Sequence, residues 1–176
     1  MPRNIEIKAI LVEPAKTRRL VEQLATAGPT LLHQDDTFFN TPTGRLKLRV
    51  FADGSGELIF YQRPDQTGPA TSDYLIVPVP DPDGMRLLLE RSMGTAGRVR
   101  KRRTLYLIGR TRVHLDEVES LGNFLELEVV LSDDESGESG LNEANRLLQE
   151  LQIASDTLID TAYVDLLNGK SRSNTR

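Results

Sequence analysis

The sequence predicts a mainly β protein of the α+β class, in which a closed antiparallel β-barrel carries helices on its outside. Two observations predict this fold. Eight segments alternate polar and apolar residues with the period of two that half-buried strands show, and only a few segments have the spacing of amphipathic helices. Closing such a sheet into a barrel also removes the exposed edges that an open sheet would have.

The expected elements follow one another in a simple order. A first strand covers residues 4–12, and Pro14 then opens a helix whose apolar stripe ends before Gly28. Asp-Gly-Ser-Gly at residues 53–56 is typical of a hairpin turn. The other strands are expected at residues 31–40, 45–51, 57–63, 72–79, 98–108, 110–118 and 123–131. The other helices are expected at residues 85–93, 141–151 and 158–167, before a disordered tail at residues 169–176.

Length and composition narrow the function. The 176 residues suit one domain, and the absence of cysteine excludes disulfides, thiolate zinc sites and cysteine nucleophiles. No apolar run approaches the length of a membrane span, and the chain enters a patterned strand directly after Met1-Pro2-Arg3 instead of a signal peptide. We therefore expect a soluble cytoplasmic protein. The formal charge of −4 argues against a general nucleic-acid binder.

The polar faces of the strands carry an unusual amount of charge. Period-two alternation puts Glu6 and Lys8 on one face of their strand, and Lys47 and Arg49 on one face of theirs. If the helices pack outside the barrel, the apolar faces meet them and the charged faces converge in the lumen. The basic residues expected there are Lys8, Lys47, Arg49, Arg63, Lys101, Arg103, Arg110 and Arg112, and the acidic residues are Glu6, Asp116, Glu126 and Glu128.

Such a lumen is net positive although the chain is acidic. Like charges that are crowded together destabilise a structure unless something neutralises them. A polyanion neutralises Lys and Arg, a divalent cation neutralises carboxylates, and a metal-bound triphosphate supplies both. The alternative is that these are solvated strand faces with surface salt bridges. That alternative suits any one pair, but it suits half a dozen strands patterned in the same way much less well.

Short motifs, in order along residues 4–167, resemble one known family. They are Asn4-Ile5-Glu6-Ile7-Lys8, Gln34-Asp35-Asp36-Thr37-Phe38-Phe39-Asn40, Gly44-Arg45-Leu46-Lys47-Leu48-Arg49, Tyr61-Gln62-Arg63-Pro64-Asp65, Ser72-Asp73-Tyr74, Lys101-Arg102-Arg103, His114-Leu115-Asp116 and Leu121-Gly122-Asn123-Phe124-Leu125-Glu126-Leu127-Glu128. Each motif alone is weak, whereas the ordered set is specific. The sequence resembles the CYTH family, also called triphosphate tunnel metalloenzymes, and within it the class IV adenylyl cyclase-like branch.

The resemblance implies a single tunnel domain over residues 1–168 with eight antiparallel strands. It implies an adenylyl cyclase, which converts ATP to cyclic AMP and pyrophosphate, or a related triphosphatase. The implied triphosphate ligands are Lys8, Lys47, Arg49, Arg63, Lys101, Arg103 and Arg112. The implied ligands of Mg²⁺ or Mn²⁺ are Glu6, Asp116, Glu126 and Glu128, and the expected catalytic residues are Lys8, Arg63 and Asp116.

One position departs from the family signature, which has Glu where this chain has Asn4. A neutral amide oxygen replaces a charged one, so we expect weaker metal binding, unless the Asn carbonyl itself coordinates the ion. This departure motivates an alternative function, a non-catalytic module that binds nucleotide or polyphosphate. Turnover with Mg²⁺ or Mn²⁺ distinguishes the two.

The run from Arg98 to Arg103 motivates a third alternative, a nucleic-acid-binding barrel. A strand would divide these charges between two faces, which weakens this hypothesis. His114 is expected to hydrogen-bond to a carboxylate or phosphate. The expected partner is a small molecule that contains a triphosphate, such as ATP or tripolyphosphate, with no nucleic acid and no membrane. A homodimer is left open.

Overall fold

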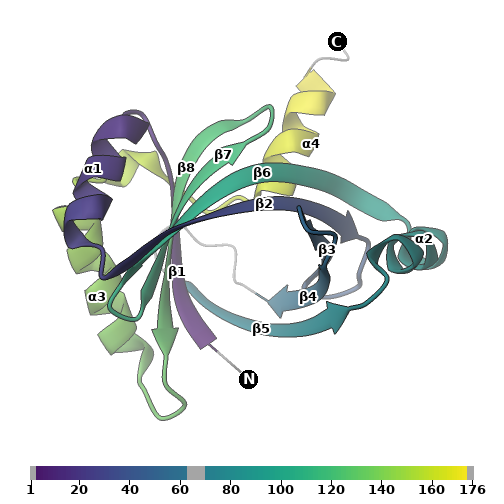
Figure 1. Cartoon of the computed structure of the whole chain (residues 1–176), viewed down its shortest axis with the longest axis horizontal. Coiled ribbons are helices and arrows are strands. Elements are labelled where there is room, and N and C mark those ends of the chain that lie inside the picture. The colour runs from purple at the N-terminus through teal and green to yellow at the C-terminus, as the bar shows by residue number, and fades with distance from the viewer. Residues whose placement is uncertain (1–2, 63–69, 174–176) are drawn as a thin grey trace.

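One antiparallel sheet of nine strands dominates the computed structural model, which describes residues 3–62 and 70–173 (Figure 1). The strands are β1 Arg3–Ile10, β2 Ala27–Phe39, β3 Arg45–Phe51, β4 Gly56–Gln62, β5 Ala70–Val79, β6 Thr95–Ile108, β7 Thr111–Val118, β8 Gly122–Leu131 and β9 Leu158–Ile159. The helices are α1 Pro14–Leu24, α2 Pro82–Met93, α3 Gly137–Glu150 and α4 Tyr163–Ser173, with a short 3₁₀ turn at Ser155–Thr157.

Eight of the strands close into a barrel, as the alternation predicts. Their order is β5-β4-β3-β2-β6-β7-β8-β1, and β1 pairs with β5 to complete the ring. The closing pair runs from Arg3 opposite Asp73 to Glu6 opposite Ala70. The next part of the same edge of β1 is taken by β9, where Lys8 lies opposite Ile159. The segment after α3 is thereby brought into the barrel wall.

The apolar faces of the strands point outward beneath the helices. The largest core cluster joins β1, β7 and β8 to α1 and α3, with Val113, Leu127 and Leu147 fully buried. A second cluster lies under α2 around Leu48 and Leu89. Figure 1 shows α1 and α3 together on one side of the barrel and α2 at its opposite end. The inner faces carry the charged side chains, together with a few apolar ones such as Phe38 and Val99, which confirms the predicted placement of charge inside the barrel.

Most predicted elements are confirmed, with shifted ends. β3 has the expected bounds, whereas β2 begins at Ala27 instead of residue 31. The last predicted helix was wrong at its start, because Leu158–Ile159 is the strand β9 and α4 begins only at Tyr163. The helix α4 ends at Ser173, and the disordered tail expected at residues 169–176 stays a prediction. Residues 174–176 lie outside the described part.

Docking of α4 on β6 depends on a glycine, and this generates a testable prediction. A Cβ at Gly97 would lie 2.5 Å from Val164 Cγ2, and Gly97 has a φ of +153°. We expect Gly97→Ala to lower the free energy of unfolding by about 1–3 kcal/mol, because the added methyl group overpacks this contact. Gly137→Ala is the matched control, since its nearest neighbour would be 4.0 Å away. Urea denaturation of both variants measures the difference, and equal midpoints would contradict the account.

Candidate functional site

The barrel lumen contains a cavity of about 310 Å³ that inward-facing side chains from all eight barrel strands line. Among the described residues the lining has seven basic side chains and five acidic ones, a net charge of +2 in a chain of net charge −4. The basic residues are Lys8, Arg45, Lys47, Arg49, Lys101, Arg103 and Arg112, and the acidic residues are Glu6, Asp36, Glu126, Glu128 and Asp160. The predicted excess of positive charge in the lumen is therefore confirmed.

One side of the lumen gathers carboxylates and a histidine from β7 and β8. His114 Nδ1 lies 3.7 Å from Glu128 Oε1 and 4.0 Å from Glu126 Oε1, and the three donor groups lie within 4.8 Å of one another. Within the part of the chain that the structure describes, the buried His114 Nδ1 has no hydrogen-bond partner. Burial holds the pKa of His114 well below its usual value, so the ring is neutral at pH 7 and offers a lone pair. We call this group the carboxylate side.

The two glutamates differ in their protonation. Burial and the negative charge of Glu126 raise the pKa of Glu128 to about 7, although Arg112 opposes this at 2.7 Å. Burial would also raise the pKa of Glu126, but Arg103 and Lys8 outweigh it and hold that pKa well below the usual range. Two carboxylates so close together do not both ionise easily without added positive charge.

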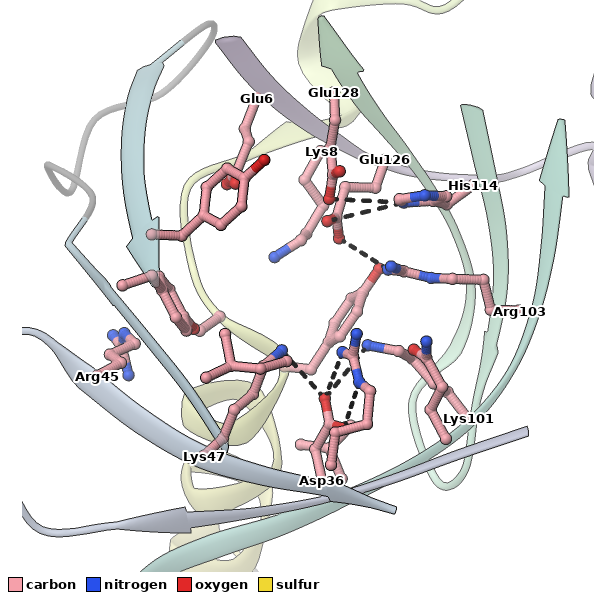
Figure 2. Close-up of a pocket in the computed structure, with 18 of the residues that line it drawn as sticks. Glu6, Lys8, Asp36, Arg45, Lys47, Lys101, Arg103, His114, Glu126 and Glu128 are labelled. Carbon is pink, nitrogen blue, oxygen red and sulfur yellow. Dashed lines mark hydrogen bonds and ion pairs between the residues drawn. The ribbon is translucent and has the colours of Figure 1, made fainter. Parts of the chain in front are cut away.

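The opposite side of the lumen is basic and is organised by Asp36 of β2 (Figure 2). Asp36 is 1% exposed and accepts hydrogen bonds from Arg49 Nε at 2.8 Å and Lys47 Nζ at 3.1 Å, with Lys101 Nζ at 3.7 Å. Burial would raise the pKa of Asp36, but these cations hold it well below its usual value. We call this group the basic side. The negative charge that balances the cations of the basic side therefore comes from a side chain of the protein, Asp36.

A tyrosine at the start of α4 connects lumen residues from several strands. Tyr163 Oη donates to Asp116 Oδ2 at 2.9 Å, and Asp116 also accepts two hydrogen bonds of 2.7 Å from Arg103. The Tyr163 ring lies 4.4 Å from Lys8 Nζ and 5.3 Å from Lys101 Nζ, within cation–π range. Arg103 also reaches Glu126 at 3.3 Å, so it contacts the carboxylate side from the strand that carries Lys101 of the basic side.

The structure brings most of the predicted site residues together. Those that line the cavity are Glu6, Lys8, Lys47, Arg49, Lys101, Arg103, Arg112, Glu126 and Glu128. Asp116 also points inward, but it lies behind Arg103, and its oxygens are engaged by Arg103 and Tyr163. Arg63 falls outside the described residues.

The placement of Arg110 in the lumen was wrong. Gly109 and Arg110 form the turn before β7, so the strand alternation starts only at Thr111. Arg110 points outside the barrel and pairs with Glu143 at 2.8 Å and with Glu135. The acidic residues near α3 therefore neutralise it.

Several site residues were not identified from the sequence. Arg45 shares the inner face of β3 with Lys47 and Arg49, and Asp36 shares that of β2 with Gln34, so alternation could have found both. Tyr163 carried no such signal, because its place depends on how α4 docks. Asn4 lines the cavity as expected, and its buried Oδ1 has no hydrogen-bond partner in residues 3–62 and 70–173.

The outer face of β6 bears on the nucleic-acid alternative. Arg98 and Arg102 point away from the lumen and pair with Asp35 and Glu117 on the neighbouring strands. Acidic partners therefore already neutralise these two positive charges, which leaves this part of β6 a mixed surface and disfavours nucleic-acid binding. Among the described residues, no helix is both long and apolar enough to cross a membrane.

Comparisons with known proteins agree with this geometry. The sequence model of the CYTH domain matches residues 2–163. A Methanocaldococcus jannaschii protein named "putative adenylate cyclase" is 28% identical over an alignment of 174 residues, and the match covers 93% of this chain and 97% of that protein. The structure of the PH1012 protein of Pyrococcus horikoshii superposes with a TM-score of 0.83 at 25% identity and covers 93% and 98% of the two chains.

A more distant fold relative is a Hippeastrum adenylyl cyclase homologue that is described as having a dominant triphosphatase activity. It superposes with a TM-score of 0.69 at 16% identity, and the match covers 97% of this chain and 96% of that chain. At this level of identity the comparison shows a shared fold.

The burial of Lys101 generates a prediction about pH. Burial and the neighbouring Arg103 lower the pKa of Lys101 to about 7, although Asp36 and Asp116 oppose the shift. Since the unfolded chain keeps this proton up to its ordinary pKa of 10.5, the unfolded state binds more protons above pH 7. The contribution of Lys101 to stability therefore rises between pH 7 and pH 10.5. Lysine ¹³Cε NMR should show one resonance that titrates near pH 7 and is lost in Lys101→Met. A set of lysines that all titrate near pH 10 would contradict the assignment.

Proposed function

Because the chain belongs to the CYTH domain family, we propose that it is a divalent-metal-dependent enzyme that acts on a triphosphate in the barrel lumen. The observation that carries this proposal is the division of the lumen into a carboxylate side and a basic side, with Arg103 between them. A metal-bound triphosphate has the complementary charges, since its oxygens suit the Lys and Arg residues and its cation suits the carboxylates.

The phosphate chain is proposed to bind Lys47, Arg49 and Lys101 on the basic side. Arg suits bidentate contacts to phosphate oxygens, whereas Lys acts as a point charge. Asp36 already holds these three side chains together, so little reorganisation is needed when the ligand enters. The remaining proposed phosphate ligands are Lys8, Arg63, Arg103 and Arg112.

The residues of the carboxylate side fit a divalent cation. His114 Nδ1 is a buried ring nitrogen with no hydrogen-bond partner among the described residues, and it lies beside two carboxylates. We assign Glu126, Glu128 and Glu6 as the oxygen ligands of Mg²⁺ or Mn²⁺, with His114 as a nitrogen ligand, which suits Mn²⁺ better than Mg²⁺. Asp116 remains a proposed further ligand, although in this structure its oxygens orient Arg103. When bound, the ion neutralises phosphate charge and activates a hydroxyl or water nucleophile.

Two reactions suit such a site. In adenylyl cyclisation the ribose 3′-hydroxyl attacks the α-phosphate and pyrophosphate leaves, whereas in hydrolysis water attacks a terminal phosphate. For both, positioning and charge neutralisation by residues such as Lys8 and Arg103 supply the catalysis. One relative is named a putative adenylate cyclase, and the Hippeastrum protein is described as having a dominant triphosphatase activity. The Asn4 amide favours a second candidate, a binding protein without turnover.

A product assay tests this proposal and includes a matched pair of variants. The protein is incubated with ATP or tripolyphosphate and with Mg²⁺ or Mn²⁺, and cyclic AMP, pyrophosphate and orthophosphate are measured. We expect metal-dependent turnover that Glu128→Gln lowers at least about 100-fold, because a metal ligand is lost. Glu117→Gln is the control, since Glu117 lies on the outer face of β7 and pairs with Arg102. Tight triphosphate binding without any product would select the binding protein.

The Asn4 position generates a separate prediction. Asn4 is 2% exposed and lines the cavity on the same face of β1 as Glu6. Asn4→Glu adds a charged oxygen that a hard divalent ion prefers, so the Mn²⁺ concentration for half-maximal binding should fall, while tripolyphosphate affinity changes little. Calorimetric titration of metal into both proteins measures this. An unchanged metal affinity would place residue 4 outside the coordination sphere.

A further inference from the structure

The exposed apolar side chains are distributed unevenly over the surface. Eight large hydrophobic residues are exposed among the described residues, and five of them lie between Leu75 and Leu88, on β5 and α2. Two of these five are neighbours on α2, where Leu87 is 52% exposed and Leu88 is 62% exposed. Single exposed hydrophobic residues are normal, whereas several of them gathered on one element indicate an interaction surface.

Leu87 lies on the side of α2 that faces away from the barrel. Met85, Leu89 and Met93 lie on the opposite side of the helix and pack in the cluster around Leu48. The helical period of 3.6 residues turns Leu87, two residues after Met85, away from that cluster. Figure 1 shows α2 at the end of the barrel opposite α1 and α3, where its outer side can meet another molecule.

A residue of opposite charge lies one turn from Leu87 on each side. Asp83 is four residues before it and Arg91 four residues after it, so the three side chains form one stripe along the exposed side of α2. Asp83 also pairs with Arg86 of the same helix. Both Asp83 in the first turn and Arg91 in the last turn complement the dipole of their own helix. The dipole explains the two charges, but it does not explain the exposed leucine between them.

This stripe is complementary to itself when its direction is reversed. If two copies of α2 pack antiparallel about a two-fold axis at Leu87, the two Leu87 side chains meet. Asp83 of each copy then lies opposite Arg91 of the other copy. Parallel packing would instead put Asp83 against Asp83 and Arg91 against Arg91. The charges therefore select a second copy of this chain in the antiparallel arrangement.

We propose that α2 is a homodimer interface, in which the helix packs antiparallel against α2 of a second copy through Leu87 and Leu88, with ion pairs between Asp83 and Arg91. The inference does not depend on the proposed function, because α2 packs outside the lumen. The helix has 12 residues and is about 18 Å long, so two such helices bury less than the roughly 1,200 Å² of a standard interface. We therefore expect a reversible dimer that dissociates on dilution.

Sedimentation velocity over a series of protein concentrations tests this interface. We expect a shift from monomer to dimer as the concentration rises. Leu87→Asp should raise the dissociation constant at least about tenfold, because it puts two carboxylates against each other at the centre of the contact. Leu31→Asp is the matched control, since Leu31 is 56% exposed but lies far along β2 from Phe39, where α2 packs. It should leave the dissociation constant unchanged.

Cysteine cross-linking tests the antiparallel register, because the chain has no cysteine of its own. Leu87→Cys puts a thiol on the two-fold axis and should give covalent dimers on mild oxidation, since a disulfide needs Cα atoms about 4.4–6.8 Å apart. A mixture of the Asp83→Cys and Arg91→Cys proteins should give the mixed disulfide, whereas neither protein alone should cross-link. Leu31→Cys is the control and should give no covalent dimer.

Three results would overturn the proposal. A monomer at every concentration would exclude the dimer and leave the α2 leucines as a contact for a different protein. Equal effects of Leu87→Asp and Leu31→Asp on the dissociation constant would place the dimer contact outside α2. Cross-linking of Asp83→Cys to itself, without the mixed disulfide, would exclude the antiparallel arrangement.

Discussion

Closure of the barrel by the β1–β5 pair is the constraint on which the lumen depends. Once the sheet is closed, the period of two leaves each side chain only two directions, toward the helices or toward the axis. Only the first half of β1 is needed for closure, and β9 takes the next part of that edge. Since β9 leads into α4, the pairing of β9 with β1 also places Tyr163 in the lumen, where it contacts Lys8, Lys101 and Asp116.

The charges that closure brings together are neutralised in pairs across strands. Asp36 forms ion pairs with the cations of the basic side, and Asp116 forms an ion pair with Arg103 at 2.7 Å. Asp36 is 1% exposed and pairs with Lys47 and Arg49, so removing it would take the counter-ion from these largely buried cations, which destabilises a protein far more than losing a surface pair. The lumen is therefore preorganised at the basic side by residues that do not themselves suit phosphate binding.

The sequence was most informative about residues whose direction depends on strand alternation alone. Alternation within a strand is local, so Lys47, Arg49, Glu126 and Glu128 could be placed in the lumen from their spacing. The same rule failed at Arg110. This residue continues the polar–apolar pattern of β7, but it belongs to the turn just before the strand. Pairings across the barrel are not local. Neither the bond from Tyr163 to Asp116 nor the lone pair of His114 can be read from a period, since both depend on how distant elements dock.

Arg103 and Arg112 give the site a reason to bind anion and cation together, because both are proposed phosphate ligands and both pair with a glutamate of the carboxylate side. Glu126 pairs with Arg103 and Glu128 pairs with Arg112, so these guanidinium groups supply positive charge to the two glutamates. Under the proposed function, a triphosphate would draw these same guanidinium groups toward its own oxygens. The two glutamates would then lie close together with less compensation, which raises the free energy of the ionised pair. A divalent cation restores that compensation, so each ligand should raise the affinity of the other by the same factor. The shared arginines, rather than the carboxylates alone, would then make the metal-bound triphosphate the preferred ligand over either component by itself.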